Sequence, residues 1–223
     1  MPQSLPEQKP RTWSQRIWYF FYHTLLGWRV FGEVPHIPKY VIVVAPHTSN
    51  WDFFIGFMAS RSIELPFPDF AVKHTVFVGP VGALLRKLGG IPIDRTKNDN
   101  VVDQIIDAFK ERDHMIMAIT PEGTRSKVQY WRSGFYHIAV GAGVPIVMVA
   151  FDYEHRQIVL APPFTPCGDP QADMARIQEF YSGIQGRHPE RQGPIRIRPV
   201  YLEGKQSIPA QPARNSAHSN VRE

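Results

Sequence analysis

Continuous apolar runs alternate along the chain with segments of helical periodicity. The run Tyr40–Ala45 is rich in β-branched residues, a pattern typical of a strand buried on both faces. Further strands are expected at residues 71–78, 114–119, 144–151, 157–161 and 195–201, and helices at 51–62, 82–88, 98–112, 132–142 and 170–187. Strands that alternate with helices predict an α/β domain with a mixed, mainly parallel sheet flanked by helices.

Aromatic side chains are concentrated in residues 13–31. The uncharged run between Arg16 and Arg29 is 12 residues long, and a helix needs about 20 apolar residues to cross a bilayer. Bulky aromatics without a small-residue cleavage site also argue against a signal peptide. We expect an aromatic amphipathic helix over 12–33 that lies at a membrane interface, because Trp and Tyr favour the headgroup level and arginines pair with lipid phosphate. The side chains expected at the interface are Trp13, Trp18, Phe21 and Trp28. The alternative is an amphipathic helix that caps the protein's own core.

The two ends of the chain are polar and differ from the middle. Residues 1–11 contain three prolines and predict a flexible arm, and residues 205–223 are rich in Ser, Asn, Ala, Pro and Gln and predict a disordered tail. We expect one α/β domain between them, over residues 34–204. A chain of 223 residues that is 43% apolar can bury a substantial core. Its single cysteine, Cys167, excludes an intramolecular disulfide and any multi-cysteine metal site.

The positive charge of the protein lies mainly at its ends. The formal charge of +5 divides into +2 over residues 1–33, +2 over residues 205–223 and +1 over the residues between them. This distribution argues against a nucleic-acid groove in the core of the domain. Basic ends beside apolar sequence suit an anionic lipid surface better.

The first candidate chemistry follows the first buried strand, in Pro46-His47-Thr-Ser-Asn-Trp-Asp52. The chain contains no GxSxG elbow, no phosphate-binding GxxxxGK[ST] loop, no GxGxxG and no HExxH. Ligands of open α/β sheets gather beyond the carboxyl ends of the strands, where this turn would lie. From the first turn of the next helix, Asp52 could orient the imidazole of His47 as a general base that takes a proton from an alcohol. The alternative is that Asp52 only caps the helix and His47 is a polar loop residue.

Three other segments have the composition of ligand-binding turns or core strands. In Thr120-Pro-Glu122-Gly123-Thr124-Arg125, the glycine lets backbone amides approach a ligand, Thr124 adds a hydroxyl, and Arg125 has the planar fork that binds phosphate. Glu122 could hold Arg125 or another cation in place, and the alternative is a turn with a surface ion pair. Residues 89–95, Gly-Gly-Ile-Pro-Ile-Asp-Arg, make a tight path that ends at a second candidate anion ligand, Arg95. Residues 144–150, Val-Pro-Ile-Val-Met-Val-Ala, suit an apolar core strand.

In this order, the four segments resemble the glycerolipid acyltransferase superfamily, and most closely its bacterial lysophosphatidic acid acyltransferase type. The hallmark of that family is HxxxxD, then a glycine-rich block that ends in Arg, then EGTR, then a Val-Pro-Ile strand. The resemblance covers roughly residues 30–165. Many members have Asn before the histidine, where this chain has Pro46.

The resemblance implies that residues 34–204 are an acyltransferase domain acting in phospholipid biosynthesis. A fatty acyl group would pass from an acyl thioester, acyl-CoA or acyl carrier protein, to the free hydroxyl of a lysophospholipid, most simply 1-acylglycerol-3-phosphate. His47 would be the base and Asp52 would stabilise its imidazolium. The residues implied in substrate binding are Glu122, Gly123, Thr124, Arg125, Arg95 and Lys73. The resemblance implies no metal, no further cofactor and no nucleic-acid partner.

Because the acceptor and the product are lipids, we expect a peripheral protein on the cytoplasmic face of a bacterial cell membrane. Two alternatives remain open from the sequence. The acceptor could be another lysolipid, such as a lyso-ornithine lipid, since the motifs define the chemistry better than the head group. The chain could also be a non-catalytic lipid-binding protein of the same fold.

Overall fold

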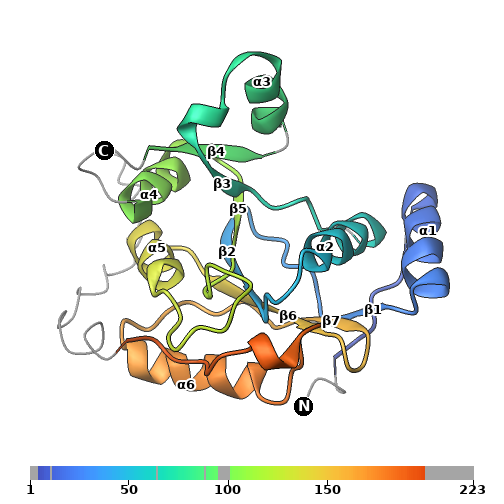
Figure 1. The fold of residues 1–223 in the computed structure, drawn as a ribbon. Helices are drawn as coiled ribbons and strands as arrows, with labels where there is room; N and C mark the ends of the chain where they lie inside the picture. Colours follow the sequence, from blue (N-terminus) through green and yellow to red (C-terminus); the bar gives the residue numbers. More distant parts are fainter. Residues whose placement is uncertain (1–4, 11, 64, 88, 95–100, 199–223) are drawn as a thin grey trace, which may run out of the picture.

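The computed structural model describes residues 5–198 except for residues 11, 64, 88 and 95–100. A mixed five-stranded sheet in the order β1-β7-β6-β2-β5 forms its centre (Figure 1). The strands are β1 (Arg29–Phe31), β2 (Lys39–Ala45), β5 (Met115–Ile119), β6 (Ile146–Asp152) and β7 (Gln157–Leu160). Strands β5, β2 and β6 run parallel, and β7 runs antiparallel to β6 and parallel to β1. The prediction of a mixed, mainly parallel sheet is confirmed.

Helices cover both faces of this sheet, and β2 is buried on both sides as its sequence predicts. Val41, Val43 and Ala45 point into one core cluster, and Tyr40 and Ile42 point into another. The first cluster lies under α4, α5 and α6, and the second lies under α2 and the N-terminal segment (Figure 1). The helices are α2 (Trp51–Ser62), α4 (Val101–Glu111), α5 (Gly134–Ala142) and α6 (Pro170–Tyr181). The period-2 alternation of strand side chains therefore divides the core into two layers.

A smaller parallel pair of strands, β3 (Phe70–Lys73) and β4 (Gly90–Ile93), carries helix α3 (Gly79–Lys87). It joins the main sheet through Asp69, whose N–H donates to Ile116 and whose carbonyl accepts from Ala118. The strand expected over residues 71–78 ends instead at Lys73, because the chain turns into a 3-10 helix at His74–Val76. Helix α3 accordingly begins three residues before its expected start.

The C-terminal part of the domain also differs from its expected boundaries. Helix α6 ends at Tyr181 rather than at residue 187, because Gly183 adopts a left-handed φ of 79° that a helix cannot continue. In the strand expected at 195–201, the described residues form one β-bridge, between Ile197 and Trp131. The tail expected at 205–223 lies outside the described residues.

The arm expected at the N-terminus is hydrogen-bonded where the structure describes it, in residues 5–10. Gln8 donates its N–H to Val30, and Pro6 accepts from the N–H of Gly32. The expectation of a loose arm is therefore wrong for these residues. The physical reason is that β1 is an edge strand, and its unpaired backbone groups accept another segment.

The aromatic segment forms a helix that is shorter than predicted. The α-helix α1 (Trp13–Tyr19) continues as a π-helix, η2 (Phe20–Leu25), and β1 follows within the range expected to be helical. In the described part of the chain, no helix is long and apolar enough to span a membrane. Trp13 lies at the surface and is 77% exposed, whereas Trp28 is buried and only 5% exposed. Trp28 is therefore not an interface residue, because it packs against the rings of Tyr22 and Tyr153.

Replacing Trp28 with Ala should lower the free energy of unfolding by about 3–5 kcal/mol, since it leaves a cavity in the core. The matched variant Trp13→Ala should change it by less than about 0.5 kcal/mol, because that ring is exposed. Denaturant titration followed by circular dichroism measures both values. Equal effects of the two substitutions would contradict this division of the segment into a buried and an exposed side.

Candidate active site

Three neighbouring parallel strands deliver the candidate chemistry to one edge of the sheet. Val43 of β2 is in register with Ile119 of β5, and Ala45 is in register with Ala150 of β6. The segments after β2, β5 and β6 therefore emerge side by side. This arrangement brings the HxxxxD turn and the EGTR turn together although 75 residues separate them in the sequence.

His47 and Asp52 form a hydrogen-bonded pair. The Nδ1 atom of His47 lies 2.9 Å from Oδ2 of Asp52. The imidazole side chain is 24% exposed and the carboxylate is 3% exposed. With Nδ1 engaged, Nε2 of His47 is the ring nitrogen left for a substrate, and within the described residues it has no hydrogen-bond partner. This is the geometry of an oriented base.

The carboxylate of Asp52 accepts hydrogen bonds on both oxygens. Oδ2 also receives the backbone N–H groups of Thr48 and Ser49, at 3.1 and 3.0 Å. Oδ1 receives the hydroxyl of Tyr153 at 2.6 Å. Asp52 therefore shapes the turn before α2 and at the same time orients His47. The alternative that Asp52 only caps the helix does not describe this carboxylate, because its backbone donors, Thr48 and Ser49, precede α2.

Tyr153 is a site residue that the sequence reasoning missed. It follows β6 directly, in the turn to β7, and 101 residues separate it from Asp52. Burial and the hydrogen bond to Asp52 raise the pKa of Tyr153 well above its ordinary value, so the hydroxyl stays a donor. The available signal was its place just beyond the carboxyl end of a parallel strand.

Glu122 joins the EGTR turn to the HxxxxD turn. Its Oε1 accepts the backbone N–H of His47 at 3.0 Å. Its Oε2 is buried and has no hydrogen-bond partner among the described residues. Burial raises the pKa of the Glu122 carboxyl above its ordinary value. The expected ion pair with Arg125 is not formed in the described structure, because the carboxylate points toward the backbone of His47 instead.

The rest of the EGTR turn is exposed. Gly123 has a left-handed φ of 64°, so the backbone conformation at this position favours glycine. Thr124 accepts a local hydrogen bond from the N–H of Ser126. The guanidinium of Arg125 is exposed and has no ion-pair partner within the described residues.

Of the two other predicted anion ligands, the structure describes one, Lys73. Lys73 is exposed at the end of β3, in the smaller sheet, and none of its described contacts reaches the His47 pair. Arg95 lies outside the described residues.

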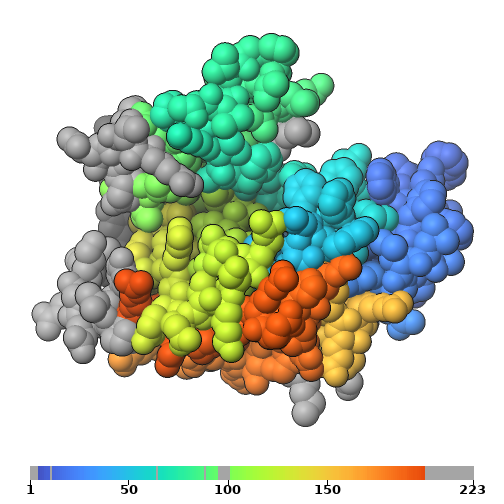
Figure 2. Space-filling model, in the orientation of Figure 1, coloured from blue at the N-terminus to red at the C-terminus, as the bar shows by residue number. Residues whose placement is uncertain are grey.

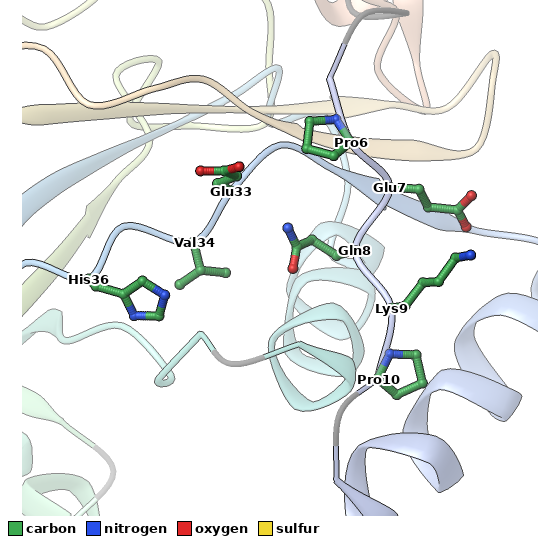
Figure 3. Close-up of a pocket in the computed structure, with 8 residues that line it drawn as sticks. All are labelled: Pro6, Glu7, Gln8, Lys9, Pro10, Glu33, Val34 and His36. Carbon is green, nitrogen blue, oxygen red and sulfur yellow. The ribbon is translucent and has the colours of Figure 1, made fainter.

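Two other features of the molecule lack the chemistry of this site. A cavity of ≈ 480 Å³ lies between the N-terminal residues 6–10 and Glu33, Val34 and His36 (Figure 3). It adjoins the start of β2, and His47 follows the other end of this seven-residue strand, about 20 Å away.

Asp152, Glu154 and His155 have ligand atoms within 4.8 Å of one another. The carboxylate of Asp152 already accepts hydrogen bonds from His155 and Gln157, which explains the cluster as a turn between β6 and β7.

A family model described as Acyltransferase matches residues 32–152, which is more than half of the chain and contains the His47 pair and the EGTR turn. The chain belongs to the Acyltransferase family. The resemblance seen in the sequence is thus confirmed.

Two curated relatives of this chain are bacterial proteins. It is 28% identical over 154 residues to the 1-acyl-sn-glycerol-3-phosphate acyltransferase of Haemophilus influenzae, with 64% of this chain and 62% of the relative covered. It is 30% identical over 125 residues to the protein of the same name from Escherichia coli, with 53% and 49% covered. The chain thus spans about half to three fifths of the length of these relatives.

A solved structure supports the fold of this chain. The crystal structure of the 1-acyl-sn-glycerophosphate (LPA) acyltransferase PlsC from Thermotoga maritima matches with a TM-score of 0.50 at 18% identity. The match covers 75% of this chain and 77% of the other. At this identity the likeness shows the shared α/β architecture.

Replacing Tyr153 with Phe removes the hydroxyl and keeps the ring that packs on Trp28. We expect the kcat of a reaction that uses the His47–Asp52 pair as its base to fall about tenfold, since a hydrogen bond to the buried carboxylate is lost. Steady-state kinetics measure kcat, and thermal unfolding measures the stability of the variant.

A purely structural role for Tyr153 would lower the thermal midpoint of the Tyr153→Phe variant and leave its kcat unchanged. The matched control is Tyr130→Phe, because Tyr130 has no contact with the pair in the described structure and its ring lies beside Arg196.

Proposed function

We propose that this protein transfers a fatty acyl group from an acyl thioester to the free hydroxyl of a lysophospholipid. The observation that carries the proposal is the His47–Asp52 pair, with Nδ1 bound to a buried carboxylate and Nε2 without a described partner. The relatives named 1-acyl-sn-glycerol-3-phosphate acyltransferase make 1-acylglycerol-3-phosphate the proposed acceptor and phosphatidic acid the proposed product.

In the proposed reaction, Nε2 of His47 accepts the proton of the glycerol hydroxyl while that oxygen attacks the thioester carbonyl. Asp52 stabilises the imidazolium through Nδ1. Collapse of the tetrahedral intermediate breaks the carbon–sulfur bond, and the proton on Nε2 passes to the leaving thiolate. The products are an ester and a free thiol carrier, CoA or acyl carrier protein. The step needs neither an acyl-enzyme nor a cofactor beyond the donor.

The exposed Arg125 has the chemistry to bind the acceptor phosphate, as the resemblance implies. Its guanidinium can make two parallel hydrogen bonds to a phosphate. In the described structure no carboxylate competes for it. Lys73 and Arg95 carry the same proposed role on the strength of the resemblance.

The His47→Ala variant tests the proposal most directly. We expect acyl transfer to fall by about 100- to 10,000-fold because a positioned base is lost, with an unchanged circular dichroism spectrum. Release of free thiol from acyl-CoA in the presence of lysophosphatidate measures the rate. The matched control is His114→Ala, an exposed histidine before β5 at the other end of the sheet, which should keep the full rate.

The same assay separates the alternatives. Thiol release with a lyso-ornithine lipid but not with lysophosphatidate would change the acceptor and keep the chemistry. Absence of thiol release with every acceptor, together with binding of lysolipid, would favour the non-catalytic reading. A His47→Ala variant that folds normally and keeps more than about a tenth of the rate would contradict the general-base role.

We further propose that the protein is peripheral on the cytoplasmic face of a bacterial membrane. Exposed apolar side chains lie on α1 and η2, on α2, and on the lobe around α3. Figure 2 shows the segment of α1 beside that of α2, and the lobe with α3 next to α2. We call this set the apolar face; it comprises Trp13, Ile17, Phe20, Phe21, Leu25, Trp51, Phe53, Phe54, Val76, Val78, Val81 and Leu84. Trp18 lies at its edge and packs on Phe57. Contiguous exposed aromatics suit the headgroup level of a bilayer.

The combined replacement of Trp13, Phe20 and Phe21 by Ala should lower partitioning onto anionic phospholipid vesicles by more than tenfold, since each buried aromatic contributes about 1.5–3 kcal/mol at full burial. Vesicle co-sedimentation measures this partitioning. The free energy of unfolding should change little because all three rings are exposed. The variant Tyr130→Ala, which removes a ring outside the apolar face, is the control. Unaltered partitioning of the triple variant would contradict membrane contact through this face.

A further inference from the structure

The segment 184–192, which follows α6, packs against the HxxxxD turn. A Cβ on Gly186 would lie 2.8 Å from Oγ1 of Thr48, so the backbone of Gly186 lies close against the side chain of Thr48. The N–H of His188 donates to the same Oγ1 at 3.1 Å. This segment lies beyond residues 32–152, the range that the family model matches. It is therefore a wall of the site that the shared motifs do not contain.

Hydrogen bonds hold this wall in one conformation. Gln192 ties the segment to itself, with Oε1 accepting from the N–H of Gly186 at 2.8 Å and Nε2 donating to the carbonyl of Ile184 at 3.0 Å. The carbonyl of Gln185 accepts the N–H of Tyr153 at 2.8 Å. The wall is thus joined to the turn between β6 and β7, which carries Tyr153, the residue whose hydroxyl donates to Asp52.

The wall carries an arginine, Arg187, that lies over the ring of the first residue of α2. The guanidinium carbon of Arg187 lies 5.1 Å from the ring centroid of Trp51, the residue just before Asp52. Its charge reaches the hydroxyl of Tyr153, whose pKa it lowers slightly against the larger effects of burial and Asp52. Within the described residues, Arg187 forms no ion pair. By contrast, its neighbour Arg191 is 3.8 Å from Glu190.

This arrangement suits the recognition of an anion. Stacking on an indole ring fixes the plane of a guanidinium and leaves its N–H edges available. Those edges match the oxygens of a phosphate group in a bidentate way. An exposed arginine without a described carboxylate partner, held next to a catalytic base, has its binding capacity free for a substrate.

We propose that Arg187 is a phosphate-binding residue of the active site, on a wall separate from the EGTR turn. The inference rests on the proposed function, in which both substrates carry phosphate: the acceptor as a phosphomonoester and the donor in its CoA or phosphopantetheine part. A reaction that holds both at once brings two anionic groups to the site. Arg125 and Arg187 come from different segments and can each bind one of them.

Steady-state kinetics of Arg187→Gln test this role and identify the substrate. KM for one substrate should rise about tenfold or more, the loss typical of a hydrogen bond to a charged group, while the other KM changes little. A rise for acyl-CoA assigns Arg187 to the donor, and a rise for lysophosphatidate assigns it to the acceptor. Arg187→Lys should recover part of the effect because it keeps the charge and loses the planar fork.

The matched control is Arg176→Gln. Arg176 is also exposed and lies 4.7 Å from the ring of Phe164, but none of its described contacts involves the HxxxxD turn. Its replacement should leave both KM values unchanged. If Arg176→Gln and Arg187→Gln raised the KM values equally, general surface charge and not a specific phosphate contact would explain the change, and the proposal would be overturned.

Binding of soluble probes separates this inference from the proposed function. Isothermal titration of the full chain with CoA and with glycerol 3-phosphate needs no turnover. Arg187→Gln should weaken at least one of the two by about tenfold, even if the protein proves inactive in acyl transfer. If the wild-type protein binds neither probe, or if the variant binds both as tightly as the wild type, Arg187 is not a phosphate ligand. An Arg187→Gln variant that loses only vesicle binding, and binds CoA and glycerol 3-phosphate normally, would also overturn the proposal.

Discussion

The buried carboxylate of Asp52 is the group on which the rest of the site depends. A charge removed from water is costly unless hydrogen bonds replace the water. Asp52 is 4% exposed and accepts from His47, from two backbone N–H groups of its own turn and from Tyr153. Three of these donors lie between β2 and α2, and the fourth comes from the far end of β6. The shape of the turn, the start of α2 and the pairing of β2 with β6 therefore all serve one carboxylate.

Parallel pairing explains why the site can be assembled from distant segments. Strands β5, β2 and β6 are neighbours and end at the same edge of the sheet, so Glu122, His47 and Tyr153 converge there. The wall formed by residues 184–192 then packs on Thr48 from the side of α6. Each of these contacts is between residues that lie far apart in the sequence, and each depends on the register of the central strands.

The N-terminal segment combines two roles that the sequence presents as alternatives. Its helix exposes aromatic rings on one side, while Tyr22 and Trp28 belong to the core on the other. Trp28 packs edge-on against Tyr153, with ring centroids 4.8 Å apart. A continuous series of packed rings thus runs from the helix that carries exposed aromatics to the tyrosine that holds Asp52. These packed rings contribute to the core and at the same time connect the segment that carries exposed aromatics to the candidate site.

By itself, the sequence determined the α/β class, the buried strand β2, the boundaries of α2, and the His47–Asp52 pair with the EGTR turn. These features depend on local information: a run of β-branched residues, helical periodicity, and a spacing of five that the first turn of a helix brings within reach. The sequence could not show that Glu122 bonds to the backbone of His47 rather than to Arg125, that Trp28 is buried, that Tyr153 bonds to Asp52, or that Arg187 lies over the ring of Trp51. Those outcomes were decided by the tertiary structure alone, because strand register and the packing of the chain after α6 bring together residues separated by about a hundred positions, and no local pattern records such contacts.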